Sequence, residues 1–124
     1  EWVVGLGLSP AMFLLVLMIG YILMGCVVDS IGMIVLTVPV LVPVLTSMDI
    51  DLIWFGVTLV LVVEIGQITP PLGINLFVID SIARRGLMDV VRGTVPYHAL
   101  IVLFLLLLAA FPELATWLPS QMSR

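Results

Sequence analysis

Long apolar segments separated by short polar ones make up most of this chain. Leu8–Val28 is apolar for about 21 residues, which at roughly 1.5 Å per residue matches a bilayer core of about 30 Å. Asp29 and Ser30 interrupt the pattern, and Ile31–Leu45 resumes it with two prolines, which remove backbone donors and bend a helix. This second run reads as too short and too bent for an ordinary span. The pattern therefore predicts a helical hairpin over residues 8–46 whose two ends lie on the same side.

A broken transmembrane helix is predicted over residues 54–83. It starts with Trp54 and Phe55, an aromatic pair suited to the headgroup level of a bilayer. Two adjacent prolines, Pro70 and Pro71, cannot lie within one regular helix, so we expect two half-helices joined by unwound chain near the membrane midplane. Unwound backbone at that depth survives only where it lines a wet cavity or contacts other protein. The break is therefore the predicted functional centre.

Residues 84–94 are predicted to form a cytoplasmic loop, because they hold three of the four arginines and arginine-rich loops stay inside. The acidic segment at Asp49 and Asp51 then lies outside. A last transmembrane helix is predicted over residues 95–118, which places the C-terminus in the periplasm.

Composition supports a membrane protein and excludes other classes. The chain is 63% hydrophobic and only 10% charged, with a mean hydropathy of +1.38, whereas soluble domains are about half apolar and a quarter charged. The net charge of −4 argues against nucleic-acid binding. The first residue is Glu1 rather than Met, so we expect residues 1–124 to be a single membrane domain from a longer chain.

The hairpin tip is the first candidate site, with Gly25, Asp29 and Ser30 as its residues. Carboxylate and carbonyl oxygens at a helix-hairpin tip can replace the hydration shell of a sodium ion. Asp29 can equally be the N-cap of the second helix, with Ser30 in its first turn. The two roles are compatible, and a hairpin that spans fully would instead put Asp29 at the surface.

The break is the second candidate site. A Gly/Thr/Pro/Pro/Gly interruption exposes carbonyls for a cation and a half-helix N-terminus for an anionic group. Its candidate residues are Gly66, Thr69, Pro70, Pro71, Gly73 and Asn75. The plainer interpretation is a kink packed against neighbouring helices, although a kink needs only one proline.

Three more ionisable residues are weaker candidates. Glu64 can be paired, act as a proton site or border the cavity, and the sequence does not choose among these roles. His98 is predicted to be an interfacial histidine rather than a proton relay. Asp80 is one turn from Arg84, which predicts an intrahelical ion pair. No nucleophile, phosphate-loop or metal-protease motif occurs, so an enzyme is not predicted.

Four segments carry a resemblance to a known family: Gly25–Ser30, Val38–Pro43, Asp51–Val57 and Glu64–Val78. The Thr-Pro-Pro-x-Gly-x-Asn-Leu-Phe string within the last segment is the specific part. In these segments the chain resembles the large permease subunit of tripartite ATP-independent periplasmic (TRAP) transporters. The resemblance covers nearly the whole chain, but only the C-terminal part of the family.

The resemblance implies a sodium-coupled importer of organic acids, such as dicarboxylates or sialic acid, in the bacterial inner membrane. It implies two partners, a periplasmic substrate-binding protein and a small membrane subunit, and no cofactor other than sodium as coupling ion. The implied fold is one half of an all-α inverted-repeat transporter, with a re-entrant hairpin packed against a discontinuous helix. By position, Gly25, Asp29, Gly66 and Thr69 would lie near sodium, and Asn75 near the ion or substrate carboxylate.

Two alternatives remain open from the sequence. A membrane-embedded structural or assembly subunit would pack against a partner without a transport site of its own. A channel would conduct without saturable, sodium-dependent uptake.

Overall fold

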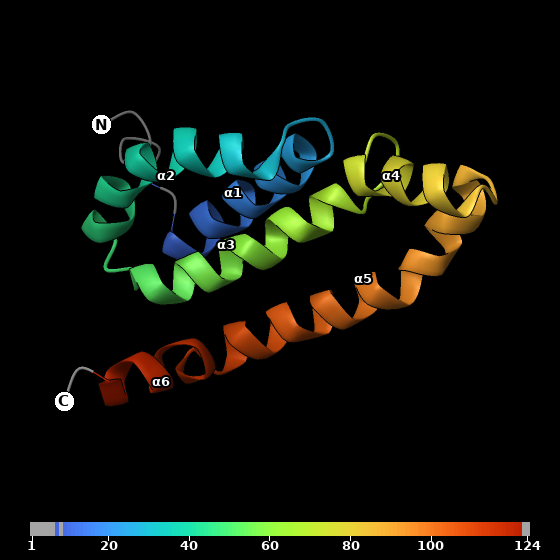
Figure 1. Ribbon diagram of the computed structural model, residues 1–124. Coiled ribbons are helices and arrows are strands. Elements are labelled where there is room, and N and C mark those ends of the chain that lie inside the picture. Colours follow the sequence, from blue (N-terminus) through green and yellow to red (C-terminus); the bar gives the residue numbers. More distant parts are fainter. Residues whose placement is uncertain (1–6, 8, 123–124) are drawn as a thin grey trace.

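The computed structural model describes residue 7 and residues 9–122, where every regular element is a helix (Figure 1). The elements are α1 (Pro10–Gly25), α2 (Ser30–Ser47), α3 (Leu52–Gln67), α4 (Ile74–Ala83), α5 (Leu87–Ala110) and α6 (Glu113–Met122). Helix α3 is central, because the α1–α2 hairpin packs on one side of it and α5 runs along the other (Figure 1).

The predicted hairpin is present as α1 and α2. Ser9 caps α1 by accepting a bond from the Met12 N–H at 3.3 Å, and proline occupies the first helical position. Helix α2 continues through Pro39 and Pro43 without ending. This run was predicted to be too short and too bent for an ordinary span, but α2 has 18 residues and is long and apolar enough to cross a membrane by length and composition, so its length alone does not exclude a span.

The broken helix is also present, as α3 and α4 with residues 68–73 between them. Asp51 caps α3 by accepting bonds from the Ile53 and Trp54 N–H groups, each at 2.8 Å. The core forms where α3 meets the hairpin, and Phe55 belongs to it with only 5% of its surface exposed. The side chain of Phe55 thus contacts other helices instead of facing outward as an interfacial anchor.

The predicted loop over residues 84–94 is much shorter, since α5 already begins at Leu87. Arg84 ends α4 in the left-handed conformation with φ at +50°, and the Gly86 N–H donates to Asp80 Oδ1 at 2.9 Å. Asp80 therefore closes this turn, and among the described residues the ion pair found is Arg92 with Asp89, not Asp80 with Arg84. Asp89 lies in the first turn of α5, where a negative charge favours the helix dipole.

The predicted last helix over residues 95–118 is instead two helices that meet at Phe111 and Pro112. Pro112 has no N–H to donate to the carbonyl of Leu108, four residues earlier. That carbonyl accepts a bond from Trp54 Nε1 of α3 at 2.9 Å instead. The indole thus satisfies the carbonyl that the proline leaves free, and it ties α5 to α3.

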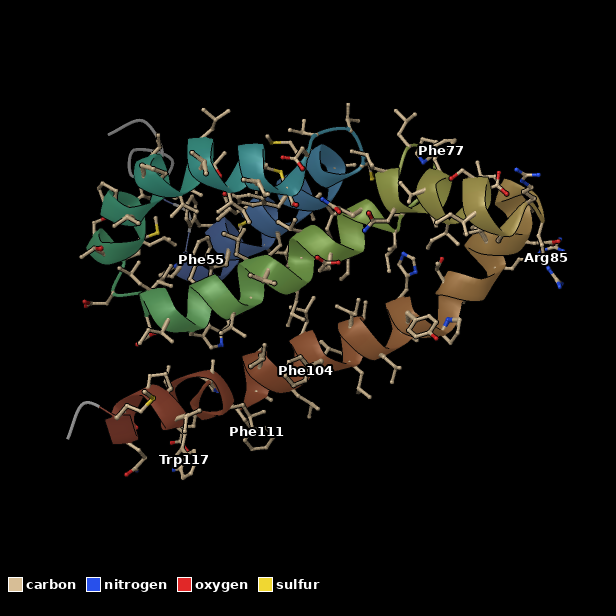
Figure 2. The ribbon with its side chains drawn as sticks, viewed as in Figure 1. Phe55, Phe77, Arg85, Phe104, Phe111 and Trp117 are labelled. Carbon is tan, nitrogen blue, oxygen red and sulfur yellow. The ribbon has the colours of Figure 1, made fainter. Side chains whose placement is uncertain are left out.

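The outer surface of these helices is largely apolar. Helices α2 and α5 are both long and apolar enough to cross a membrane by length and composition. Figure 2 shows Phe111 and Trp117 on the arm formed by α5 and α6, and 60% and 62% of their surfaces are exposed. Such a surface suits lipid or further protein rather than water.

Candidate functional site

The hairpin tip and the end of α3 touch through two glycines. A Cβ added to Gly66 would lie 2.9 Å from both the Gly25 Cα and the Ile22 carbonyl oxygen, and one added to Gly25 would lie 3.2 Å from the Gly66 Cα. No side chain fits between backbones this close. The sequence-predicted residues Gly25 and Gly66 are therefore brought together, directly before the break.

Two helix C-termini meet at this contact. Helix α1 ends at Gly25 and α3 ends at Gln67. The last carbonyls of a helix carry partial negative charge. At these two ends, the carbonyls of Ile22, Met24 and residues 64–66 also accept backbone bonds from the turns that follow, and an oxygen that accepts a single bond keeps a second lone pair. The convergence of the two ends is an environment that favours a hard cation, which prefers oxygen ligands.

The break itself is folded tightly around Gly73. A Cβ on this residue would lie 2.6 Å from the Gln67 carbonyl oxygen and 2.9 Å from that of Thr69. Pro70 and Pro71 are exposed, and the peptide bond between them is cis. Because Pro71 cannot donate to Gln67, the Gln67 carbonyl has no partner among the hydrogen bonds of the described residues. This oxygen is a candidate cation ligand.

Thr69 makes contacts both within its own segment and across to α5. Its hydroxyl donates to the Ile65 carbonyl at 2.5 Å, and Oγ1 lies 3.1 Å from His98 Nε2. The other ring nitrogen of His98, Nδ1, lies 3.0 Å from the Thr94 carbonyl oxygen. His98 is thus half-buried against the break, and the role of a simple interfacial histidine does not describe these contacts.

An amide pair joins the two half-helices. Asn75 Nδ2 donates to Gln67 Oε1 at 3.2 Å, and only 8% of the Gln67 surface is exposed. The bond connects the last residue of α3 with the second residue of α4. Asn75 therefore holds the ends of the break together.

Asp29 and Ser30 stand apart from this group. Asp29 is exposed and caps α2, since its Oδ2 accepts from the Gly32 N–H at 3.0 Å. Ser30 opens α2 and is half-buried. In the part of the chain that the structure describes, no hydrogen bond joins either side chain to the break.

The N-terminus of α4 differs from that of α2. Gly73 precedes α4 and supplies no side-chain cap, whereas the Asp29 carboxylate occupies the corresponding position at α2. An uncapped helix N-terminus leaves N–H donors and partial positive charge for an anion. The break thus combines a carbonyl-rich end of α3 with a donor-rich start of α4.

Sequence reasoning did not place His98 or Gln67 in this arrangement: His98 was predicted to be an interfacial histidine, and Gln67 was not a candidate. His98 is 29 residues from Thr69, and Gln67 is eight from Asn75. No local pattern signals either pairing, apart from the presence of polar side chains within apolar runs. Glu64 is exposed on α3 and makes none of the described ion pairs.

Two other features of the described residues bear on an ion site. No group of three His, Cys, Asp or Glu side chains among them is placed to hold a metal ion. A groove of about 390 Å³ lies between α1 and α2, with Tyr21 and Thr37 as its hydrogen-bonding side chains. These two bond each other, so the groove offers an apolar surface rather than ion ligands.

Comparison with known proteins identifies the family. Residues 1–114 match the family model described as "Tripartite ATP-independent periplasmic transporter, DctM component". The chain belongs to this family. Its members are transporters rather than enzymes, and with two membrane-length helices the chain is an integral membrane protein of that family.

Individual relatives agree with the family. The C4-dicarboxylate TRAP transporter large permease protein DctM of Vibrio cholerae is 35% identical over 97% of this chain, and that of Pseudomonas aeruginosa is also 35% identical over 97%. The sialic acid TRAP transporter permease protein SiaT of Haemophilus influenzae is 31% identical over 90%. The chain spans 26%, 28% and 18% of the lengths of these three relatives. No solved structure matches the chain.

Proposed function

We propose that this chain is the C-terminal part of a TRAP large permease that takes up small organic acids in symport with sodium. The substrates are carboxylates of the kind that the relatives' names specify, C4-dicarboxylates or sialic acid. The partners are a periplasmic substrate-binding protein and a small membrane subunit, as the tripartite family name implies. The rival function is that of an assembly subunit without a transport site. Such a subunit would not need the polar side chains that contact one another at the break, so their presence favours the transport function.

The contact between Gly25 and Gly66 carries the proposal, because it brings two helix C-termini together beside a broken helix. Sodium would be held by backbone carbonyls of this corner together with Thr69 Oγ1. Hard cations take such oxygen ligands, and helix C-termini at a discontinuous helix supply them in membrane transporters. Asp29 would act as a cap that borders the site.

The substrate carboxylate would bind at the N-terminus of α4. This helix has ten residues and no side-chain cap, so its first N–H groups are open to an anion. Asn75, in the first turn, would add a polar side chain beside the carboxylate. The remainder of the substrate pocket would come from parts of the permease that this chain does not contain, since transporters of this kind are built from two related halves.

The proposed topology is that of a bacterial inner-membrane protein with α1 and α2 as a re-entrant hairpin. The positive-inside rule favours a cytoplasmic side for the turn between α4 and α5, because Arg84, Arg85 and Arg92 lie in or near it, and α6 would then lie on the periplasmic side. Labelling of a cysteine introduced at Arg85, in a Cys26→Ser background, should occur only from the cytoplasmic face. Labelling from the periplasm would reverse this orientation.

The test of sodium coupling is Thr69→Val in the complete transporter, reconstituted in liposomes with its partner subunits. The substitution removes one oxygen at nearly constant volume, so we expect the sodium concentration for half-maximal uptake to rise about five- to tenfold, the effect of one hydrogen bond of about 1 kcal/mol. Uptake of a radiolabelled C4-dicarboxylate at graded sodium concentrations measures it.

Thr46→Val is the matched control. Thr46 makes the same kind of bond to a carbonyl four residues earlier, Val42 at 2.8 Å, but it lies on α2 away from the break. Its removal should leave the sodium response unchanged. An unaltered sodium response in Thr69→Val, or uptake that neither saturates nor depends on sodium in the unmodified protein, would contradict the proposal.

A further inference from the structure

The Thr69 hydroxyl has two hydrogen-bond neighbours, the Ile65 carbonyl at the end of α3 and the ring of His98 on α5. Thr69 Oγ1 lies 2.5 Å from the Ile65 carbonyl oxygen and 3.1 Å from His98 Nε2. The Thr69 hydroxyl has one proton, and it can be donated to only one of these neighbours at a time. Whether the proton points to Ile65 or to His98 therefore determines which lone pairs of Thr69 Oγ1 and of the Ile65 carbonyl are available to a ligand.

The ring of His98 is oriented by its own helix. Nδ1 lies 3.0 Å from the carbonyl of Thr94, one turn earlier on α5, and a carbonyl can only accept. Nδ1 therefore carries a proton. In the neutral ring, Nε2 then has a lone pair and no proton, so it faces Thr69 Oγ1 as an acceptor.

A cation at the break would change where the hydroxyl proton points. If sodium contacts both Thr69 Oγ1 and the Ile65 carbonyl, a proton between these two oxygens would be repelled by the ion and would block the lone pairs that the ion needs. His98 Nε2 is the neighbouring acceptor, at hydrogen-bond distance from the same hydroxyl. Rotation of one hydroxyl would therefore release one lone pair on Thr69 Oγ1 and one on the Ile65 carbonyl, which keeps its bond from the Ile68 N–H at 3.3 Å.

We propose that His98 is a positioning residue of the ion site: when the cation binds, His98 Nε2 accepts a hydrogen bond from the Thr69 hydroxyl, and a lone pair of Thr69 Oγ1 and one of the Ile65 carbonyl become available to the cation. The proposal rests on the sodium site proposed above. No bond is made or broken other than hydrogen bonds, and no net charge moves. A plain structural strut, in which the ring of His98 only packs between α5 and the break, would not depend on the Thr69 hydroxyl.

Two variants of His98 in the complete transporter separate these roles. His98→Gln places an amide oxygen near the position of Nε2, so it retains an acceptor for Thr69, whereas His98→Asn is too short and retains only a group near Nδ1. We expect the half-saturating sodium concentration to rise about fivefold in His98→Asn, the effect of one ordinary hydrogen bond. In His98→Gln it should stay within about twofold of the unmodified value.

The Thr69→Val background supplies the decisive comparison. If His98 acts through the hydroxyl, His98→Asn should add no further loss of sodium affinity once Thr69 is valine. The sodium-induced rise in melting temperature of the purified transporter gives a second readout that does not need uptake. The sodium-induced rise in melting temperature should be smaller in His98→Asn and should stay near that of the unmodified protein in His98→Gln.

The outcomes distinguish this inference from the proposed function. A normal sodium response in Thr69→Val would overturn the ion site, and the role of His98 with it. A weakened response in Thr69→Val with a normal one in His98→Asn would overturn only the role of His98. Equal losses of sodium affinity in His98→Asn and His98→Gln would show that His98 is only a structural strut. A further loss on adding His98→Asn to Thr69→Val would show the same.

Discussion

Two proline interruptions divide the helices of this chain, and they are closed in different ways. At Pro112, the Leu108 carbonyl that loses its helical partner accepts the Trp54 indole N–H at 2.9 Å. At Pro71, the Gln67 carbonyl that loses its partner receives no hydrogen bond among the described residues. One interruption is satisfied and the other retains an open acceptor.

The two interruptions also differ in how closely the rest of the protein packs around them. The break after Gln67 is packed against another backbone at Gly25, is contacted by His98 and is joined across its ends by Asn75. Phe111, at the other interruption, is 60% exposed. A proline thus marks a change of helix direction, whereas tertiary contacts that hold open polar groups in place are typical of a binding site.

The largest effect in this comparison is expected from Gly73→Ala. The added Cβ would lie 2.6 Å from one backbone oxygen and 2.9 Å from another, so the break must open, at a cost of about 2–3 kcal/mol in the free energy of unfolding. Sodium-dependent uptake should be lost with it. Thermal unfolding of the purified transporter, followed by tryptophan fluorescence, measures the change in stability.

Gly93→Ala is the control for that substitution. Gly93 lies within α5, and a Cβ added there would have nothing within 4 Å, so alanine should leave stability unchanged or raise it by about 0.5–1 kcal/mol. If Gly73→Ala were as stable and active as Gly93→Ala, the break would not be a tightly packed site.

A smaller effect is expected from Asn75→Leu, which removes the amide that joins α4 to α3. The Gln67 amide then loses its 3.2 Å partner while it remains buried, which costs about 1–2 kcal/mol. Uptake at saturating sodium should fall with stability. Thr116→Val, which removes a 3.4 Å bond to Pro112 beside the other interruption, should have no measurable effect on either. Equal effects of the two substitutions would remove the distinction between the interruptions.

The smallest effect concerns the satisfied interruption. Trp54→Phe deletes the indole N–H and leaves the Leu108 carbonyl without its donor, at a cost of about 1 kcal/mol in stability. Pro112→Ala restores a backbone N–H that can reach this carbonyl, so the double variant should recover most of the loss. A double-mutant cycle of melting temperatures measures the coupling. Additive effects would show that Trp54 does not replace the missing helical bond.

Local pattern predicted the hairpin and the broken helix, and it failed at the helix ends near the C-terminus. The last helix was predicted to begin at Val95 because the arginines suggested a loop before it, yet the turn needs only residues 84–86 once Asp80 bonds the Gly86 N–H. The last helix was expected to continue past Pro112, although that proline lacks the N–H on which continuation depends. Charge and proline positions therefore indicate several places where a helix can begin or end. They do not indicate at which of these places it does so in the folded protein.

The sequence by itself determined the membrane character of this protein, its helical hairpin and the place where a helix must break, because hydropathy and proline act on the chain locally. Only the tertiary structure decided which groups meet at that break. Gly25 lies against Gly66, His98 faces Thr69 from 29 residues away, and Trp54 reaches Leu108 across 54 residues. Such pairings depend on the crossing and rotation of whole helices, which are set by packing across the fold and leave no mark in the order of neighbouring residues.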